Sequence, residues 1–374
     1  MLRTDVSPGR ALPTHQQAEA LQLVTPDGVR RDDPVYDPVV ADVDDEKLLS
    51  LYEDMVVVRR FDTEAVALQR QGQLGLWPPL LGQEAAQIGS ARALRSDDFV
   101  FSSYRENGVA YCRGAQPTDL MRVWRGTALA GWDPRAIGMA TPQVMIGSQT
   151  LHATGYALGC VKDGVDSVAV AYFGDGATSK GDVHEAMVFA ASYRTPEVFF
   201  LQNNQWAISV PVATQSRAPL HKRGEGYGMP SIPVDGNDVL ASWAVTRVAL
   251  DEARSGLGPR AIEAMTYRMG AHTTSDDPTK YRTAEEEESW RRRDPIDRMR
   301  AYLLGRGASE AFFAEVDAES AAVADDIRIR TTELGGLEPE AMFAHVYSDP
   351  HPLVEEQRRW FADYEASFDQ EGAS

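Results

Sequence analysis

Apolar side chains recur at spacings of three and four between residues about 44 and 71, and this period predicts an amphipathic helix. The repeating positions are Leu48, Leu51, Tyr52, Met55 and Val58. Asp44 or Asp45 is suited to cap its start. A Gly- and Pro-containing break at 72–82 follows, and a second helix is expected from Gln83 to about Leu94.

Farther along the chain, short apolar runs alternate with helical patterns. We expect a short strand beginning at Phe99, helices at about 107–124 and 148–161, and a long loop at 125–143. From there, strands and helices alternate at 168–173, 182–193, 198–202, 238–254 and 261–267. This alternation predicts an α/β fold, in which a mostly parallel sheet has helices on both faces.

The two ends of the chain differ from this middle part. Residues 1–45 are rich in Pro, Asp and Gln, and we interpret them as an extended or partly disordered arm. Its apolar patch, Leu21, Leu23 and Val24, is expected to dock on a neighbour. The predicted domains are therefore the arm at 1–45, an α/β domain at 46–300 and a helical C-terminal extension at 301–374.

Charge and composition narrow the possible functions. A net charge of −19 argues against nucleic-acid binding, because phosphate contacts need clustered Lys and Arg. Cys112 and Cys160 are the only cysteines, so a disulfide framework is not expected. The N-terminus has no apolar signal core and no run is long enough for a membrane span, which favours a cytoplasmic protein.

Two polar motifs directly follow predicted strands. Gly174-Asp175-Gly176 comes after the strand ending at Phe173, and Asn203-Asn204 comes after the next strand, with 26 residues between Gly176 and Asn203. Parallel strands joined by one crossover end at the same edge of a sheet, so Asp175 and Asn204 should converge. Carboxylate and amide oxygens suit Mg²⁺, and glycines let the backbone approach a phosphate. These residues predict a Mg²⁺-diphosphate site.

With these motifs, the chain resembles a known family, the α subunits of 2-oxo acid dehydrogenase E1 components, over about residues 45–365. The two motifs above are similar to that family's thiamine diphosphate motif. Further segments follow in the family's order: Leu81-Gly-Gln-Glu-Ala, Tyr104-Arg-Glu-Asn-Gly, Gln149-Thr-Leu-His-Ala-Thr-Gly, Val234-Asp-Gly-Asn-Asp and His272-Thr-Thr-Ser-Asp-Asp-Pro-Thr-Lys-Tyr-Arg. The resemblance implies a thiamine diphosphate-binding fold, with thiamine diphosphate and Mg²⁺ as cofactors.

The resemblance also implies roles for individual residues. Asp175, Asn204 and the Trp206 carbonyl would bind the metal, although the family usually has Gly-Tyr where this chain has Gln205-Trp206. Ile146 would support the bent cofactor, and His272 would be the catalytic residue, orienting the diphosphate or moving a proton. The implied cofactor-binding set is Ser103, Tyr104, Arg105, Val144, Ile146, Gly174, Asp175, Gly176, Ala177, Gln202, Asn204 and His272.

Two parts of the family's site have no counterpart in this sequence. Many relatives carry a histidine in the loop that corresponds to 125–143, and this chain has none there. The carboxylate that activates the pyrimidine belongs to a separate β subunit in the family, and we interpret Glu84 as structural. The resemblance therefore implies an E1 β partner in an α2β2 heterotetramer, together with a lipoyl-bearing E2 acyltransferase.

The resemblance does not point to a single 2-oxo acid as the substrate. The N-terminal Val-Thr-Pro-Asp-Gly stretch and the segment beginning at Asp294 resemble branched-chain 2-oxo acid dehydrogenases. The Pro-Gln-Val-Met-Ile-Gly stretch at 142–147 and the Ser-Asp-Asp-Pro-Thr stretch at 275–279 also suit bacterial pyruvate enzymes. We favour branched-chain acids over pyruvate, and an acetoin-cleaving relative is a third alternative. A non-catalytic α-like subunit and a self-sufficient transketolase-like enzyme are the alternatives of other classes. Thr273, Thr274 and Ser275 lie where some relatives are phosphorylated, and we interpret them as a polar loop.

Overall fold

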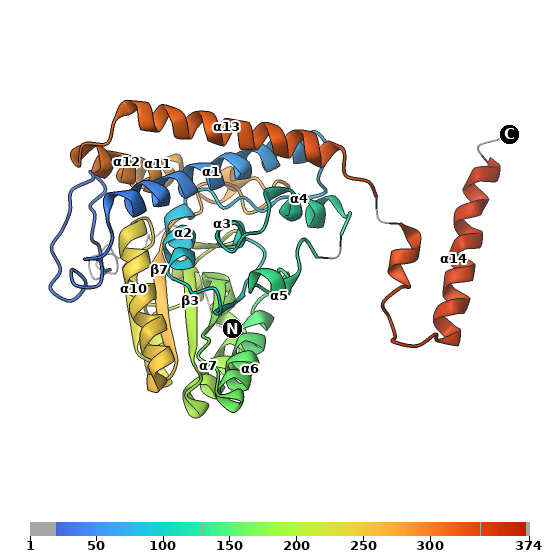
Figure 1. The fold of residues 1–374 in the computed structure, drawn as a ribbon, viewed down its shortest axis with the longest axis horizontal. Coiled ribbons are helices and arrows are strands. Elements are labelled where there is room, and N and C mark those ends of the chain that lie inside the picture. The colour runs from blue at the N-terminus through green and yellow to red at the C-terminus, as the bar shows by residue number, and fades with distance from the viewer. Residues whose placement is uncertain (1–19, 129, 337, 372–374) are drawn as a thin grey trace, which may run out of the picture.

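A five-stranded parallel sheet forms the centre of the computed structural model, which describes residues 20–128, 130–336 and 338–371 (Figure 1). Every neighbouring pair of strands in it is parallel. The middle strands are buried along almost their whole length, as expected when helices cover both faces. In spatial order the strands are β1 (Phe99–Phe101), β2 (Ala169–Gly174), β3 (Glu197–Asn203), β7 (Arg260–Met265) and β6 (Ser231–Asp235).

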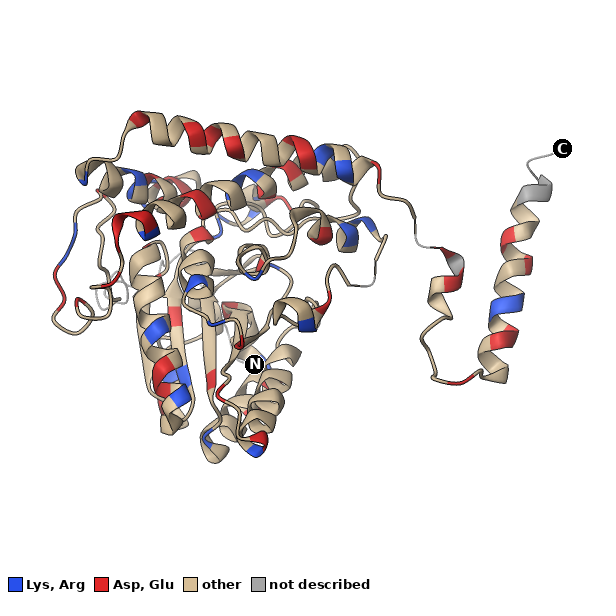
Figure 2. Cartoon of the chain, viewed as in Figure 1, with Lys and Arg blue, Asp and Glu red and all other residues tan. Residues whose placement is uncertain are grey.

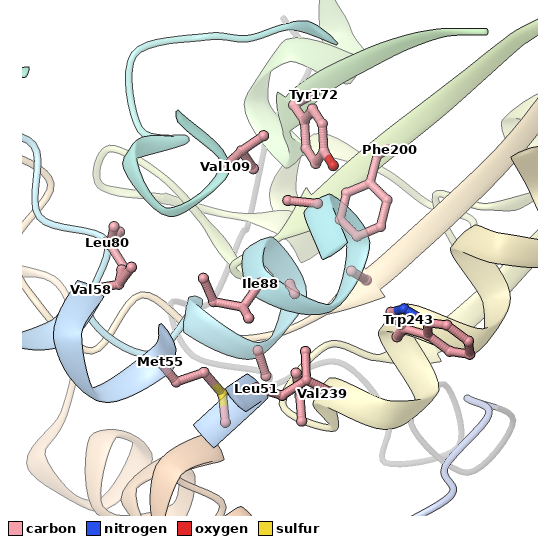
Figure 3. Packing of buried hydrophobic residues seen from close by; sticks show 14 of the residues in the cluster. Leu51, Met55, Val58, Leu80, Ile88, Val109, Tyr172, Phe200, Val239 and Trp243 are labelled. Atoms are coloured by element: carbon pink, nitrogen blue, oxygen red, sulfur yellow. The ribbon is translucent and has the colours of Figure 1, made fainter. Parts of the chain in front are cut away.

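Successive strand side chains point to opposite faces, and each face packs on its own pair of helices. One face, with Tyr172 and Phe200, packs against α2 (Glu84–Arg92) and α10 (Val239–Glu252) (Figure 3). The other face, with Phe173 and other alternate residues, packs against α6 (Ser148–Asp163) and α7 (Gly181–Tyr193). The predicted α/β fold with helices on both faces is confirmed.

A further helical layer lies above the sheet and contains many of the charged residues (Figures 1 and 2). Asp44 caps the long helix α1 by accepting a hydrogen bond from Lys47 N. The layer contains α1 (Asp45–Arg70), α12 (Pro295–Gly305) and α13 (Glu310–Thr332). Helix α13 packs along α1. There the Tyr52 ring contacts Phe312 in a tilted arrangement and Phe313 edge to face.

The remaining elements are short, apart from the last helix, which stands away from the body of the chain (Figure 1). A hairpin is formed by β4 (Trp206–Ala207) and β5 (Val210–Pro211). The α-helices are α3 (Asn107–Cys112), α4 (Pro117–Arg125), α5 (Pro134–Ile137), α8 (Val212–Gln215), α9 (Lys222–Gly226), α11 (Ala284–Arg291) and α14 (Pro352–Glu371). The 3₁₀-helical elements are η2 (Asp175–Ser179), η4 (Pro278–Lys280) and η5 (Pro339–Met342). Element η3 (Ala253–Leu257) is a π-helix.

Both outer strands of the sheet pair with short extended segments. Leu21 bridges to Val234 on β6, through hydrogen bonds from Leu21 N to Pro233 O and from Asp235 N to Leu21 O. On the other side, Met139 bridges to Val100 on β1. The second segment belongs to the loop predicted at 125–143, so the end of that loop is fastened to the sheet.

The structure differs from two of the sequence predictions. The single helix expected at 107–124 is two helices, because Gly114 has a left-handed φ of 100° and Pro117 starts a new helix. The apolar patch of the arm packs on its own chain: Leu23 and Val24 are buried, and their backbone N–H groups bind Asp238.

Residues 1–19 of the predicted arm lie outside the described residues. The division into arm, domain and extension stays a prediction. In the part of the chain that the structure describes, none of the helices is both long and apolar enough to cross a membrane.

Candidate functional site

Asp175 and Asn204 follow neighbouring strands at the same edge of the sheet. Gly174 on β2 is in register with Gln202 on β3, so the two loops begin side by side. Both residues line one cavity of about 440 Å³. This volume lies within the ~300–1000 Å³ typical of small-molecule sites. The predicted convergence of Asp175 and Asn204 is confirmed.

The Asp175 carboxylate is buried with few hydrogen-bond donors around it. Its Oδ2 accepts from Gln215 Nε2 at 3.1 Å, while its own carbonyl holds Thr178 Oγ1 at 2.6 Å and closes the turn. Burial raises the pKa of Asp175 to about 6, although hydrogen bonds and Arg268 act in the opposite direction. A desolvated carboxylate of this kind is stabilised when a cation binds beside it.

The Asn204 amide is held in one orientation. Its Nδ2 donates to Gln83 Oε1 at 3.1 Å, and its Oδ1 accepts from Trp206 N at 3.3 Å. Because the nitrogen is engaged by Gln83, the oxygen remains the group available to a ligand in the cavity. Within the described ranges, His, Cys, Asp and Glu form no cluster of three or more that could hold a metal ion. A cation here would need amide, carbonyl, phosphate or water oxygens in addition, which is how Mg²⁺ is usually bound.

Two guanidinium groups meet at His272 on one wall of the cavity. Arg105 Nη2 donates to the His272 carbonyl at 3.0 Å and lies 3.1 Å from Nδ1, and Arg268 Nη1 lies 3.3 Å from Nδ1. Burial, then Arg105 and Arg268, lower the pKa of His272 to about 3. The ring is therefore neutral, with Nδ1 accepting hydrogen bonds and Nε2 carrying the proton.

Arg268 is itself buried among other positive charges. Burial and the neighbouring Arg105 lower the pKa of its guanidinium to about 10, so it stays charged at neutral pH. It donates to the Trp206 carbonyl at 3.0 Å and to the Ile208 carbonyl at 2.8 Å. Two buried guanidinium groups that form no ion pair within the described ranges lie beside one cavity, and this favours an anionic ligand.

Another part of the cavity lining consists of neutral polar groups and tight turns. Gln149 lines it with a buried Oε1 that has no hydrogen-bond partner, so a ligand donor can be received there. A Cβ at Gly176 would lie 2.8 Å from Ala207 Cβ, so only glycine allows this close approach. Gly147, with a φ of 88°, turns the chain immediately after Ile146.

Almost all of the predicted site residues line this cavity. They are Ser103, Tyr104, Arg105, Ile146, Gly174, Asp175, Gly176, Ala177, Gln202, Asn204, Trp206 and His272. Val144 lies outside the cavity lining and is 65% exposed. The Trp206 carbonyl, expected as a metal ligand, also accepts the hydrogen bond from Arg268.

Several lining residues were not identified from the sequence: Gln83, Glu106, Gly147, Gln149, Lys180, Ala207, Ile208 and Arg268. A usable signal existed for Arg268, because it follows β7 at the same sheet edge as the two motifs. Glu84 is structural as expected: it is buried, accepting from Arg59 Nε and Gly82 N, both at 2.9 Å.

The loop after His272 is held by its own polar groups. Asp276 Oδ2 accepts from His272 N at 2.9 Å, and Thr274 Oγ1 accepts from Trp77 N at 3.1 Å. The Thr273 hydroxyl accepts from Ser275 N at 3.3 Å. These contacts agree with the interpretation of Thr273 to Ser275 as a polar loop.

Comparison with known proteins gives the same answer as the motifs. The pattern of the family described as "Dehydrogenase E1 component" matches residues 52–332. The chain is 48% identical over 342 residues to the 3-methyl-2-oxobutanoate dehydrogenase subunit alpha of Mycobacterium tuberculosis, covering 91% of this chain and 92% of that protein. It is 40% identical over 296 residues to the pyruvate dehydrogenase E1 component subunit alpha of Staphylococcus epidermidis, covering 79% of each. The resemblance seen in the motifs is confirmed, and the chain belongs to the dehydrogenase E1 component family.

Proposed function

We propose that this chain is the α subunit of a thiamine diphosphate-dependent 2-oxo acid dehydrogenase E1, acting on branched-chain acids of the 3-methyl-2-oxobutanoate type. The observation that carries the proposal is the cavity at the ends of β2, β3 and β7. It combines a carboxylate and an amide oxygen suited to Mg²⁺ with cationic groups suited to a diphosphate.

The residues present fit the cofactor. Asp175 and Asn204 would bind Mg²⁺, with the Trp206 carbonyl as the third protein ligand. Arg105 and Tyr104 would bind the diphosphate, and Gly176 lines the same cavity. Thiamine diphosphate, when bound, supplies the electron sink that allows a 2-oxo acid to lose CO₂.

His272 would act on protons at this site. Its Nδ1 accepts from Arg105 and Arg268, so Nε2–H is the group that can donate to a ligand. Arg105 and Arg268 also keep the ring from rotating, since both also bind neighbouring backbone carbonyls. Binding a negatively charged diphosphate beside the two guanidinium groups would raise the pKa of His272 and let it exchange protons nearer neutral pH.

A second subunit would complete the site. Of the carboxylates lining the described cavity, Asp175 faces the metal position, and Glu106 is bound by Ser103 and Gln202. The carboxylate that activates the pyrimidine would therefore come from an E1 β chain, in an α2β2 assembly that passes its acyl group to a lipoyl-bearing E2. The relatives are named as α subunits, which supports a β partner. A cytoplasmic location stays the expectation from the sequence.

The substrate preference rests on the relatives. A branched-chain enzyme is favoured by the 48% identity to the 3-methyl-2-oxobutanoate dehydrogenase subunit, and pyruvate is the second candidate because of the 40% identity to pyruvate dehydrogenase subunits. One methylene group in an apolar pocket changes kcat/KM by about 10–200-fold. Activity on both kinds of acid is therefore expected, with different efficiencies.

Two measurements test the proposal. Titration calorimetry should show Mg²⁺-dependent binding of thiamine diphosphate that Asp175→Ala abolishes. The chain co-expressed with its β subunit should decarboxylate 3-methyl-2-oxobutanoate, 4-methyl-2-oxopentanoate and pyruvate in an assay with an artificial electron acceptor. We expect kcat/KM to be higher for the two branched-chain acids than for pyruvate. Intact Mg²⁺-dependent binding in Asp175→Ala would overturn the site, and a higher kcat/KM for pyruvate would overturn the substrate.

A further inference from the structure

A buried acid–histidine pair lies behind the Asn203-Asn204 turn, outside the cavity. Glu263 sits on β7 across from β3 and is 3% exposed. One carboxylate oxygen accepts from Asn203 Nδ2 at 2.7 Å. The other accepts from the His221 backbone N–H at 2.7 Å and from His221 Nδ1 at 2.9 Å. Each carboxylate oxygen therefore accepts from a different segment of the chain, the end of β3 or the segment at His221.

The bond from Glu263 sets the orientation of the Asn203 amide. With Nδ2 directed at Glu263, Oδ1 is turned to the next residues, where it accepts from Gln205 N and Gln205 Nε2, both at 3.2 Å. The Asn203 carbonyl accepts from Thr266 N at 2.9 Å. Asn203 thus fixes the start of the turn that carries Asn204.

This turn needs such support because its backbone is strained. Gln205 has a φ of 76° and Ile208 a φ of 57°, both in the left-handed region. That region costs a residue with a side chain about 1–2 kcal/mol. Asn204 and Trp206 flank Gln205, so relaxation of Gln205 would move both of the proposed ligand oxygens.

The segment that supplies His221 also reaches the other ligand loop. Arg223, two residues later, donates from Nη1 to the carbonyl of Thr178. Thr178 in turn binds the Asp175 carbonyl through its hydroxyl. His221, Arg223, Thr178 and Glu263 all line one small pocket.

We propose that Glu263, held by His221, is a positioning residue for the magnesium site, fixing the Asn203-Asn204 turn so that Asn204 and Trp206 present their oxygens to the cavity. The proposal rests on the proposed function and adds to it a group that contacts neither cofactor nor substrate. Partners that orient metal ligands typically contribute 10–100-fold to metal affinity, because they hold the ligands in a binding geometry.

The test measures metal affinity directly. Full-length chain co-expressed with its β subunit is titrated with Mn²⁺, followed by electron paramagnetic resonance, in the presence of thiamine diphosphate. Glu263→Ala is expected to raise the Mn²⁺ Kd about 10–100-fold, with kcat at saturating metal close to that of the wild type. Glu263→Gln keeps a carbonyl for Asn203 Nδ2 but places an amide nitrogen against the His221 N–H donor, so it is expected to restore only part of the affinity.

A matched control is available on the neighbouring strand. Glu197 is fully buried at the start of β3, far from the ligand-bearing edge, and binds Thr154 and Thr195. Glu197→Ala is expected to lower Tm without changing the Mn²⁺ Kd. An equal rise in Kd for Glu197→Ala and Glu263→Ala would show a general stability effect and overturn the positioning role.

The remaining outcomes separate this inference from the proposed function. If the wild type binds Mn²⁺ with thiamine diphosphate and Glu263→Ala binds it equally well, the positioning role alone is refuted. If the wild type shows no metal-dependent cofactor binding, the proposed function fails first. If Glu263→Ala does not fold, Asn203→Ala decides, because it removes the amide that Glu263 holds. An unchanged Mn²⁺ Kd in that variant would refute the positioning role.

Discussion

Asp62 should make the stability of this protein depend on pH in a way that one substitution removes. The residue lies on α1 and is 2% exposed. Its Oδ1 accepts from Trp77 Nε1 at 2.7 Å, and both oxygens lie 3.1 Å from Leu80 N. These bonds hold the segment whose Pro79 carbonyl receives Arg105 Nη1 at 2.6 Å. Asp62 therefore supports the cavity wall from a distance.

Burial, more than any neighbouring charge, raises the pKa of Asp62 from 3.8 to about 7. The folded state thus keeps a proton that the unfolded state has lost, so stability is fully present below pH 3.8 and falls as pH rises to about 7. At 1.36 kcal/mol per pH unit, the whole loss is about 4 kcal/mol. Between pH 5 and pH 8 it is about 3 kcal/mol.

Asp62→Asn cannot ionise, so it should gain about 3 kcal/mol relative to the wild type when pH is raised from 5 to 8. Its amide nitrogen adds a buried donor, which gives a constant penalty of about 1–3 kcal/mol at both pH values. Urea unfolding, followed by tryptophan fluorescence at pH 5 and pH 8, measures the difference. Asp326→Asn, on the exposed surface of α13, is the control and should show none. An equal free-energy difference at both pH values for Asp62→Asn would refute the reasoning.

Three further predictions concern the site and the arm. His272→Ala should bind thiamine diphosphate within about tenfold of the wild type, because Arg105 and Arg268 remain, but lose about 10²–10⁴ in lipoyl acylation; unchanged single-turnover acylation would contradict the acid–base role. Gln205→Gly should be about 1 kcal/mol more stable than Gln205→Ala in thermal unfolding, since only glycine adopts the left-handed φ without strain; equal stability would contradict it. Leu23→Ala should destabilise the chain by about 2–5 kcal/mol in urea, and a surface-like effect below about 0.5 kcal/mol would show that the arm is not part of the core.

The central part of the fold could be predicted because its sequence period is regular. The three- and four-residue spacing of α1 and the buried runs of β2 and β3 appear directly in the apolar pattern. Strand β6 was not predicted, since it is short, half-buried and contains Pro233, which an edge strand tolerates. The break between α3 and α4 was missed, although Gly114 and Pro117 mark it.

The site residues likewise include some that the sequence predicted and some that it did not. Asp175 and Asn204 were found because connectivity alone places the ends of adjacent parallel strands together. Gln83 and Gln149 reach the cavity from the starts of helices, and their positions depend on how those helices pack on the sheet. His221 carried no pattern in the sequence, because its role comes from a contact with a residue 42 positions away.

The pairing of Leu21 with β6 and of Met139 with β1 also limits how this chain can associate. An uncovered strand at the side of a sheet offers a row of free N–H and C=O groups to any other extended chain, which is a common route to aggregation. Here those groups on Pro233, Asp235 and Val100 are already taken by the chain itself. Assembly by continuing the sheet from one molecule into another is thereby blocked along these stretches. This favours partner contacts made through side chains, whose shapes and charges can distinguish one partner from another.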